Sequence, residues 1–371
     1  MSDLAELLKA KDASIDVDDD FDAINKLYLE RGWGDGLPII PPTAGRVEKM
    51  LEYCDRPWNE PIAKIAPRYG EATPLRLAAN AVMAGCAPNY FPLFMLAIEA
   101  MCEEPFNLYG VQATTHLCAP LVIVNGPVVA ELGINSGHNA FGPGTRSNAA
   151  IGRAIRLALV NIGGAIPTLG DMSTFGAPSK FSYFVAENEA NSPWEPLSVE
   201  RGFAKEASTV TVVGAECPHN INDHESLTGL GLLTTIAGTM AITGSNDTYY
   251  LAQPVIVMGP EHAKAIANDG YSKADAKRFL QEHATLPLGK FSKENIERRF
   301  RVTFKDKYAN AGLDAPVFAI QKADDIIIVV IGGAGKHSAY IPTFGATRAV
   351  TRALKRKDGQ LAKSVEEFRK S

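Results

Sequence analysis

Three short runs of β-branched residues constrain the fold of this chain most. They are "LVIVNGP" (121–127), "PVIVMGP" (254–260) and "IIIVVIGG" (326–333). Each run is apolar at successive positions and ends in Gly or Pro, which is typical of strands covered on both faces. Long segments with helical patterns lie between them. The sequence therefore predicts an α/β fold, or a closely mixed α+β fold.

Two of these runs belong to a predicted internal repeat. Shifting the chain by 133 residues aligns 122–137 with 255–270, with eight identities in sixteen positions. A duplicated strand–turn–helix unit predicts two half-units flanking a cleft. The alternative is chance, because strand, Gly-Pro turn and helix are common parts. The predicted divisions are an N-terminal helix with a Gly/Pro-rich strap (1–60), a first half-unit (61–205), a second half-unit (206–345) and a basic C-terminal helix (346–371).

Capping signals predict the ends of several helices. Thr73, Pro74 and Gly85 match the N-cap, first position and stop of one helix. A second helix is predicted from about Ser147 to the glycines at 163–164. Ser272 begins a third, with an acidic residue in capping-box register.

Charge and cysteine usage limit the classes of partner. The net charge is −5 and the pI about 5.9, which argues against nucleic acid and anionic membranes as partners. The acidic start lacks the pattern of a secretory signal, and the apolar runs are too short for a membrane span. Five cysteines without a C-x-x-C pair favour reduced thiols. We expect a cytoplasmic homo-oligomer that binds neither nucleic acid nor membrane.

Two cysteines are candidate nucleophiles. Cys86 and Cys217 each precede a Pro-containing segment that we interpret as a helix start. The positive end of a helix favours the thiolate, which is the reactive form of cysteine. The alternative is structural, because free cysteines are among the most buried residues.

Residues 216–226, "ECPHNINDHES", follow the predicted strand "STVTVVGA" and are dense in polar groups. The region just past a strand is where α/β proteins place ligands. His219 and His224 are candidate general acids or bases. The alternative is that Asp223 and Ser226 cap the following helix. No H-E-x-x-H or cofactor motif is present, so the sequence names no cofactor and leaves a metal ion open.

Two Gly-rich turns are candidate anion sites. "GPGTRSN" (142–148) leads into a helix start, where Arg146, Ser147 and Asn148 are predicted to bind a small anionic substrate. "GGAGKHS" (332–338) fails the P-loop pattern. Its position after a predicted strand still makes Lys336 and His337 candidates. Ordinary caps and a solvated arginine face explain the first turn equally.

Lys180 lies in a polar and aromatic stretch, 171–196, that we expect to be an ordered loop over the cleft. It is a further candidate for binding the substrate. A solvated surface loop is the alternative.

The segment "RGWGDGLPIIPPT" (31–43) has a constrained backbone. Its three glycines accept positive φ and its three prolines fix φ, so one conformation is expected. Trp33 and Asp35 are its only large aromatic and its only carboxylate. If the segment crosses the cleft, Asp35 is a candidate catalytic residue; otherwise it ties an N-terminal helix to the core.

The chain resembles an uncharacterised bacterial family with the RGWxDGLPxxPPT motif. The resemblance rests on that motif and on four further segments: "MAGCAPNYFPLFMLAIEAM", "GVQATTHLCAPLVIVNGP", "GPGTRSNAAIGRAIRLALVNIGG" and "PHNINDHES". Members are often encoded beside small proteins with a UGSC or CGSC selenol or thiol motif. The resemblance implies a small thiol or selenol partner protein in a small-molecule transformation.

We therefore expect an enzyme that cleaves a carbon–heteroatom bond in a small anionic substrate, as a lyase or hydrolase. A Cys thiolate, a His acting as general acid or base, or both would carry the reaction. The first alternative is a subunit of a two-component thiol- or selenol-dependent reductase or dehalogenase. The second is a ligand-binding or scaffold protein without catalysis.

Overall fold

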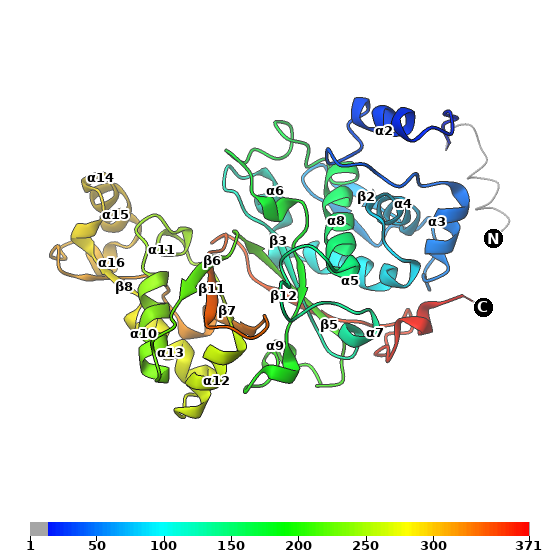
Figure 1. Cartoon of the computed structure of the whole chain (residues 1–371). Coiled ribbons are helices and arrows are strands. Elements are labelled where there is room, and N and C mark those ends of the chain that lie inside the picture. The colour runs from blue at the N-terminus through cyan, green and yellow to red at the C-terminus, as the bar shows by residue number, and fades with distance from the viewer. Residues whose placement is uncertain (1–13, 371) are drawn as a thin grey trace. The chain divides into compact units, whose positions relative to one another are not determined.

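The structure is a computed structural model that describes residues 14–370. The described chain divides into two compact units (Figure 1). Unit 1 comprises the chain up to Ala186, Ser198–Val213, and the residues from Ala349 onward. Unit 2 comprises Glu187–Leu197 and Gly214–Arg348. Most of the acidic start discussed above, residues 1–13, lies outside the described residues.

Unit 1 contains one four-stranded sheet, a short hairpin and most of the early helices. Its helices are α2 (Phe21–Glu30), α3 (Ala44–Leu51), α4 (Pro74–Ala84), α5 (Phe91–Met101), α6 (Leu108–Ala113), α7 (Val128–Glu131) and α8 (Arg146–Asn161), and α9 (Leu197–Glu200) lies at its boundary. Its strands are β1 (Ala63–Ile65), β2 (Gly70–Ala72), β3 (Ala119–Asn125), β4 (Phe184–Ala186), β5 (Thr209–Ala215) and β12 (Val350–Ala353).

The sheet of unit 1 has the order β12-β5-β3-β4. β3 pairs in parallel with β4, and β12 pairs antiparallel with β5. Every residue of β3 and β5 is buried, as expected for strands that are covered on both faces. The prediction of a buried strand at 121–127 is confirmed.

Local sequence signals set the ends of the long helices. Thr73 caps α4 by accepting a hydrogen bond from the Arg76 amide, Pro74 opens the helix, and Gly85 ends it in the left-handed conformation. Ser272 and Asp275 form the predicted capping box of α13. These predictions are confirmed because the capping contacts lie within one helical turn.

Unit 2 contains a second four-stranded sheet and a two-stranded antiparallel sheet. Its helices are α10 (Gly229–Met240), α11 (Asn246–Tyr249), α12 (Pro260–Asn268), α13 (Lys273–His283), α14 (Lys293–Asn295), α15 (Arg301–Thr303) and α16 (Lys305–Tyr308). Its strands are β6 (His219–Asn222), β7 (Val255–Met258), β8 (Thr285–Pro287), β9 (Pro316–Phe318), β10 (Ile327–Val330) and β11 (His337–Ile341).

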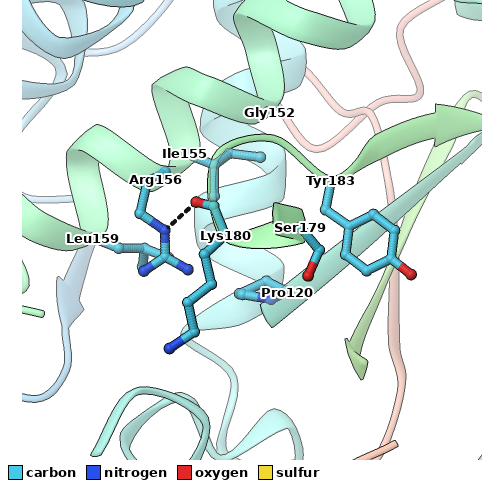
Figure 2. Close-up of a pocket in the computed structure, with 8 residues that line it drawn as sticks. All are labelled: Pro120, Gly152, Ile155, Arg156, Leu159, Ser179, Lys180 and Tyr183. Atoms are coloured by element: carbon cyan, nitrogen blue, oxygen red, sulfur yellow. Dashed lines mark hydrogen bonds between the residues drawn. The ribbon is translucent and has the colours of Figure 1, made fainter. Parts of the chain in front are cut away.

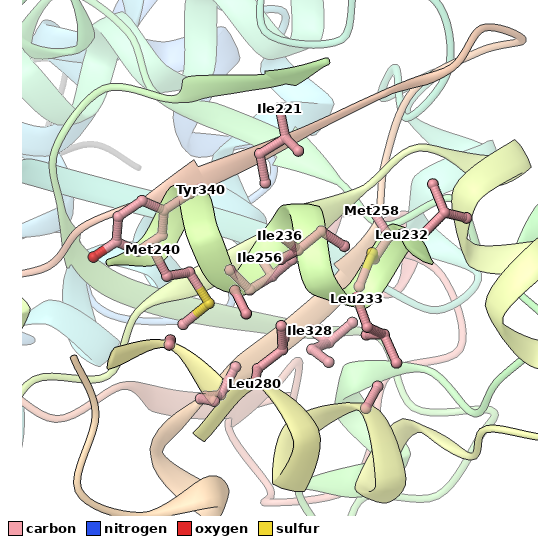
Figure 3. Close-up of a cluster of buried hydrophobic side chains, with 14 of the residues drawn as sticks. Ile221, Leu232, Leu233, Ile236, Met240, Ile256, Met258, Leu280, Ile328 and Tyr340 are labelled. Atoms are coloured by element: carbon pink, nitrogen blue, oxygen red, sulfur yellow. The ribbon is translucent and has the colours of Figure 1, made fainter. Parts of the chain in front are cut away.

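The core of unit 2 lies between its sheet and helices α10, α12 and α13. The sheet order is β10-β7-β11-β6, and the predicted strands at 254–260 and 326–333 are confirmed as β7 and β10. Leu233 and Ile236 of α10 pack against Ile256 and Ile328 of the sheet (Figure 3). The fold is therefore mixed α/β. Within residues 14–370, none of the helices combines the length and apolar character that crossing a membrane takes.

The two sheets correspond strand by strand. In unit 1, β3 lies between its parallel neighbour β4 and strand β5. In unit 2, β7 lies between its parallel neighbour β10 and strand β11. β5 is followed in the chain by β6, which joins the sheet of unit 2. β11 is likewise followed by β12, which joins the sheet of unit 1.

The turns after β3 and β7 differ in conformation. Gly126 has a φ of 87° and leads into the four-residue α7, whereas Gly259 has a φ of −63° and leads into the nine-residue α12. The duplication therefore stays a prediction, supported by the shared strand order.

The basic helix predicted over 346–371 is wrong. Residues Val350–Ala353 form β12, and the described remainder contains turns and one short 3-10 helix at Val365–Phe368. Thr351 and Thr211 share a hydrogen bond of 2.9 Å across the strands, and Gly359 turns the chain with a φ of 83°. Pairing with a strand 140 residues away outweighs the local helical periodicity.

A buried carboxylate anchors the chain after β11. Asp247 accepts a hydrogen bond of 2.6 Å from the Tyr340 hydroxyl and one of 3.0 Å from the Thr343 amide. Burial raises the pKa of Asp247 to about 7, although these hydrogen bonds oppose the shift. The carboxyl group therefore takes up a proton within the neutral range.

We expect unit 2 to lose stability as the pH rises from 5 to 7. Asp247 has a folded pKa above its unfolded value of 3.8, so its contribution is complete below pH 4 and is lost as the pH rises through 7. The free energy of unfolding should fall by about 2 kcal/mol over this range. Urea titrations of the wild type and Asp247→Asn should show the slope only in the wild type. A matched change of the exposed Asp306 to Asn should keep it, and a slope that survives in Asp247→Asn would refute this assignment.

Candidate functional site

Polar side chains converge at one edge of the unit 2 sheet. β7 and β10 run parallel, and β11 runs antiparallel to both β7 and β6. β6, β7 and β10 therefore end at the same edge, where β11 begins at His337. The carboxyl edge of parallel strands is where open α/β sheets bind ligands.

Two imidazoles meet at this edge. His224 Nε2 lies 3.2 Å from His337 Nε2, and His337 Nδ1 lies 3.0 Å from Asn220 Oδ1. An amide oxygen only accepts, so His337 carries its proton on Nδ1 and presents the Nε2 lone pair. His224 Nε2–H then donates to His337. When both imidazoles are neutral, His224 Nδ1 therefore carries a lone pair of electrons. No other described residue forms a hydrogen bond with that atom.

A lysine lies beside the imidazole pair. Lys336 Nζ donates a hydrogen bond of 2.7 Å to the His224 carbonyl oxygen. An ammonium group has three donors, so two remain for a ligand. The preceding Gly335 has a φ of 137° and donates its amide to Glu261 Oε1 at 2.7 Å, which shapes the turn that presents Lys336 and His337.

A buried histidine, His262, forms hydrogen bonds to residues next to the imidazole pair. His262 Nε2 lies 3.0 Å from the Asp223 carbonyl oxygen, and His262 Nδ1 lies 2.8 Å from Ser338 Oγ. His262 therefore donates to Asp223 and accepts from Ser338, while Ser338 Oγ accepts the Gly259 amide at 3.1 Å. These bonds fix the residues adjoining both His224 and His337.

The supporting groups have defined charges. Burial lowers the pKa of His262, so its imidazole is neutral at pH 7. Burial acts to raise the pKa of Asp223, but hydrogen bonds from Thr235 and the Ser226 amide outweigh it and hold the pKa at about 2. Asp223, which precedes His224 in the chain, is therefore ionised at neutral pH. It does not cap α10, whose N-cap is Thr228.

A glycine allows the close packing at this edge. A Cβ atom on Gly259 would lie 2.1 Å from the His337 carbonyl oxygen. Any larger residue at 259 would therefore displace the backbone that carries His337.

His219 lies apart from the imidazole pair. It pairs across the sheet with Tyr340, and Asn220 pairs with Ala339. Side chains alternate between faces, so His219 shares the face of Tyr340 and Ile221, which point toward the helices (Figure 3). Asn220 and His337 lie on the other face. The structure thus joins His224 to His337 and separates His219 from both.

The surroundings of Cys86 favour the structural alternative over an activated thiolate. Its amide donates to the Ala81 carbonyl oxygen, so Cys86 belongs to the end of α4 and does not open α5, which starts at Phe91. Burial raises the pKa of the Cys86 thiol to about 12, against the positive charge of Arg146. The thiol is therefore protonated at neutral pH.

Cys217 does not lie at a helix start either. It is a half-buried cysteine in the connection between β5 and β6. The next helix, α10, begins twelve residues later at Gly229. The helix-terminus argument for a thiolate therefore fails at Cys217 as well.

The predicted anion site at 146–148 is largely occupied by the protein itself. Ser147 Oγ donates to the Gly133 carbonyl oxygen at 2.9 Å, and the Asn148 side chain bonds to both backbone groups of Asn135. Both side chains are buried. Arg146 Nε donates to the Gly85 carbonyl oxygen at 3.0 Å. Ser147 and Asn148 hold the preceding loop and are closed to a substrate.

Lys180 is also committed to a structural contact. Its ammonium bonds both oxygens of Asp171, at 2.6 and 2.7 Å, and its carbonyl oxygen accepts from Arg156 Nε at 2.7 Å. Figure 2 shows Lys180 and Arg156 at a cavity of about 10 Å³. That volume holds one water molecule at most, so it is too small for a substrate.

Asp35 forms an ion pair within unit 1. Arg153 Nε and Nη2 lie 2.7 and 2.9 Å from its two oxygens, and Arg153 Nη2 also donates to the Leu37 and Pro38 carbonyl oxygens. Burial acts to raise the pKa of Asp35, but the hydrogen bonds and charge of Arg153 outweigh it and lower the pKa. Asp35 therefore clasps the segment 31–43 to α8.

Two members of the site were missed in the sequence. Asn220 lies within the polar stretch 216–226, but its partner His337 is 117 residues away. His262 lies in the first turn of the helix after β7, a position at the carboxyl edge of a parallel strand. This position could have identified His262 as a candidate site residue from the sequence.

Neither a metal-binding cluster among the described residues nor a similar protein was found. Within residues 14–370, no group of three or more His, Cys, Asp or Glu side chains is arranged to hold a metal ion. Comparison of the chain with family models, curated proteins and solved structures gave no match.

Proposed function

We propose that the chain is an enzyme that cleaves a carbon–heteroatom bond in a small anionic substrate, with His224 transferring protons and His337 stabilising the charge that His224 gains. The observation that carries the proposal is the imidazole pair itself, with its Nε2 atoms 3.2 Å apart and Asn220 fixing the tautomer of His337. In such a pair one imidazole can act first as the base and then as the acid, with the second imidazole beside it.

The arrangement supports a proton cycle for an elimination. His224 Nδ1 takes the proton from the substrate carbon, and the C–H electron pair forms the new double bond. The heteroatom leaves with the electron pair of its bond and takes the proton back from the imidazolium. During the cycle, the positive charge on His224 is stabilised by the Nε2 lone pair of His337. In a hydrolysis, the same base would take its proton from water.

Lys336 is the proposed anion contact. Its ammonium is held beside His224 by one hydrogen bond, which leaves two donors for a substrate carboxylate. A carboxylate there would place the neighbouring carbon close to the imidazole pair. Positioning of this kind lowers the barrier because it removes the entropy cost of bringing the groups together.

A second proposal is that a small thiol or selenol protein is required as partner. It is favoured by the state of the chain's own thiols. Burial raises the pKa of Cys54, and that of Cys86 and Cys102 to about 12. A reaction that depended on one of these three thiols would then need a reactive group from another chain.

The first proposal is tested with a panel of small carboxylates that carry a hydroxyl, amino, thioether or halide group on the neighbouring carbons. We expect the wild type to convert at least one of them, measured by ¹H NMR. Conversion only after addition of a small Cys-rich protein would support the second proposal. Tight binding without conversion would contradict both and indicate a ligand-binding protein.

A further inference from the structure

Unit 1 contains a groove of about 640 Å³ next to the segment 31–43. Its walls come from α2, the segment itself, α4 and the end of α8. The volume lies in the range of about 300–1,000 Å³ that is typical of small-molecule sites. Unlike the cavity beside Lys180, this groove is large enough for an organic ligand.

The aromatic wall of the groove is held in place. Trp33 donates its amide to the Tyr28 carbonyl oxygen at 3.0 Å and accepts a hydrogen bond of 2.9 Å from Asn161 Nδ2. The rings of Trp33 and Tyr28 meet edge to face at 5.5 Å. The clasp between Asp35 and Arg153 fixes the chain two residues further on. These bonds hold the backbone of Trp33, and the edge-to-face contact with Tyr28 orients its ring, which reduces the entropy cost of binding.

The chemistry of the lining favours a planar ligand. Pro42, Ala79, Met83 and Ile162 supply apolar surface. Among the described residues, neither the Trp33 indole N–H nor the Tyr28 hydroxyl has a hydrogen-bond partner. The groove thus offers ring faces together with two neutral donors.

The charge of the lining favours an anion. Arg76 is the one charged residue among those that line the groove, and no carboxylate faces it there. One Arg76 nitrogen donates to the Glu71 carbonyl oxygen at 3.0 Å, and no described residue forms an ion pair with this guanidinium. Its remaining donors match the two oxygens of a carboxylate.

We propose that this groove is a binding site for a planar carboxylate, whose ring lies against Trp33 and whose carboxylate pairs with Arg76. The segment "RGWGDGLPIIPPT" then forms one wall of a ligand site and is fixed there by the Asp35–Arg153 clasp. The site lies wholly within unit 1 and uses none of the residues of the imidazole site in unit 2.

Titration calorimetry with 2-naphthoate tests the proposal, with 2-naphthamide as its neutral match. We expect the wild type to bind the acid at least tenfold more tightly than the amide. Arg76→Met should abolish that preference, and Arg369→Met, which removes an exposed arginine elsewhere in unit 1, should leave it unchanged. Equal affinity for the acid and the amide, or full affinity in Arg76→Met, would overturn the proposal.

Two further variants keep the test decisive. Ala79→Phe should fill the groove and abolish binding without changing its charge, and circular dichroism shows whether each variant folds. His337→Gln should bind 2-naphthoate as tightly as the wild type. Loss of binding in His337→Gln with full binding in Ala79→Phe would place the ligand in unit 2 and refute the assignment to this groove.

Discussion

Replacing His337 with glutamine is expected to slow turnover of the converted carboxylate by about a hundredfold to ten-thousandfold. Glutamine lacks the imidazole lone pair that stabilises the positive charge on His224 during the proton cycle. It retains the size and hydrogen-bonding capacity needed to contact Asn220. The measurement is kcat and KM by ¹H NMR, and we expect the loss in kcat, because His337 acts on the reaction more than on the binding of the ground state.

His219→Gln is the matched control for this variant. His219 is also an exposed histidine on the β6–β11 strand pair, but it faces the other side of the sheet. Turnover should therefore change less than twofold. Equal losses in His219→Gln and His337→Gln, or full turnover in His337→Gln, would show that the imidazole pair is not the catalytic group.

Replacing Asp35 with asparagine is expected to lower the free energy of unfolding of unit 1 by about 3 kcal/mol. The exposed fractions of the Asp35 and Arg153 side chains are 5% and 17%, so the change leaves a largely buried guanidinium without its carboxylate. Trp33 and Trp58 lie in unit 1 and Trp194 in unit 2. Urea unfolding followed by tryptophan fluorescence in a Trp194→Phe background therefore reports on unit 1.

Glu30→Gln is the control for the clasp. It removes one partner of the exposed Lys26–Glu30 pair, in which the side chains are 76% and 62% exposed, so the expected loss is below about 0.5 kcal/mol. The pH dependence is a second check. Asp35 has a folded pKa below its unfolded value of 3.8, so its contribution is present above pH 4 and is lost as the pH falls through the folded pKa. A gap between wild type and Asp35→Asn that stays constant below pH 4 would contradict this account.

The local parts of the fold could be predicted from the sequence. The strands at 119–125, 255–258 and 327–330 are buried along their whole length, and that leaves a continuous apolar run in the sequence. The capping box at Ser272 is equally local. The basic tail was mispredicted because β12 is defined by its partner β5, and no local pattern records that pairing.

The candidate site was predicted only in part, for the same reason. Lys336, His337 and His224 were recognised as separate polar turns, but their contact depends on the antiparallel register of β6 and β11. The sequence left both interpretations of Cys86 open, because a residue between two helices can belong to the end of the first or the start of the second. Its amide bonds to the first helix, and burial then keeps the thiol protonated.

In the segment 31–43, the side chain that the sequence suggested for a site is not the one that faces the groove. Its glycines and prolines indicated a fixed conformation, and its carboxylate suggested a catalytic role. The carboxylate is in fact taken by Arg153, which lies 118 residues further along the chain. The residue that faces the groove is its neighbour Trp33. The sequence showed that the segment is constrained, but only the packing on α8 shows which side chain is left for a ligand.

The central claim is that the imidazole pair of unit 2 binds and transforms the substrate. A long-range ¹H–¹⁵N NMR spectrum of the histidine rings, recorded before and after addition of the converted carboxylate, tests it most directly. We predict that free His337 carries its proton on Nδ1, and that His224 and His337 shift on binding while His219 and His283 do not. A proton on His337 Nε2 in the free protein, or unchanged His224 and His337 signals at saturating substrate, would contradict the account.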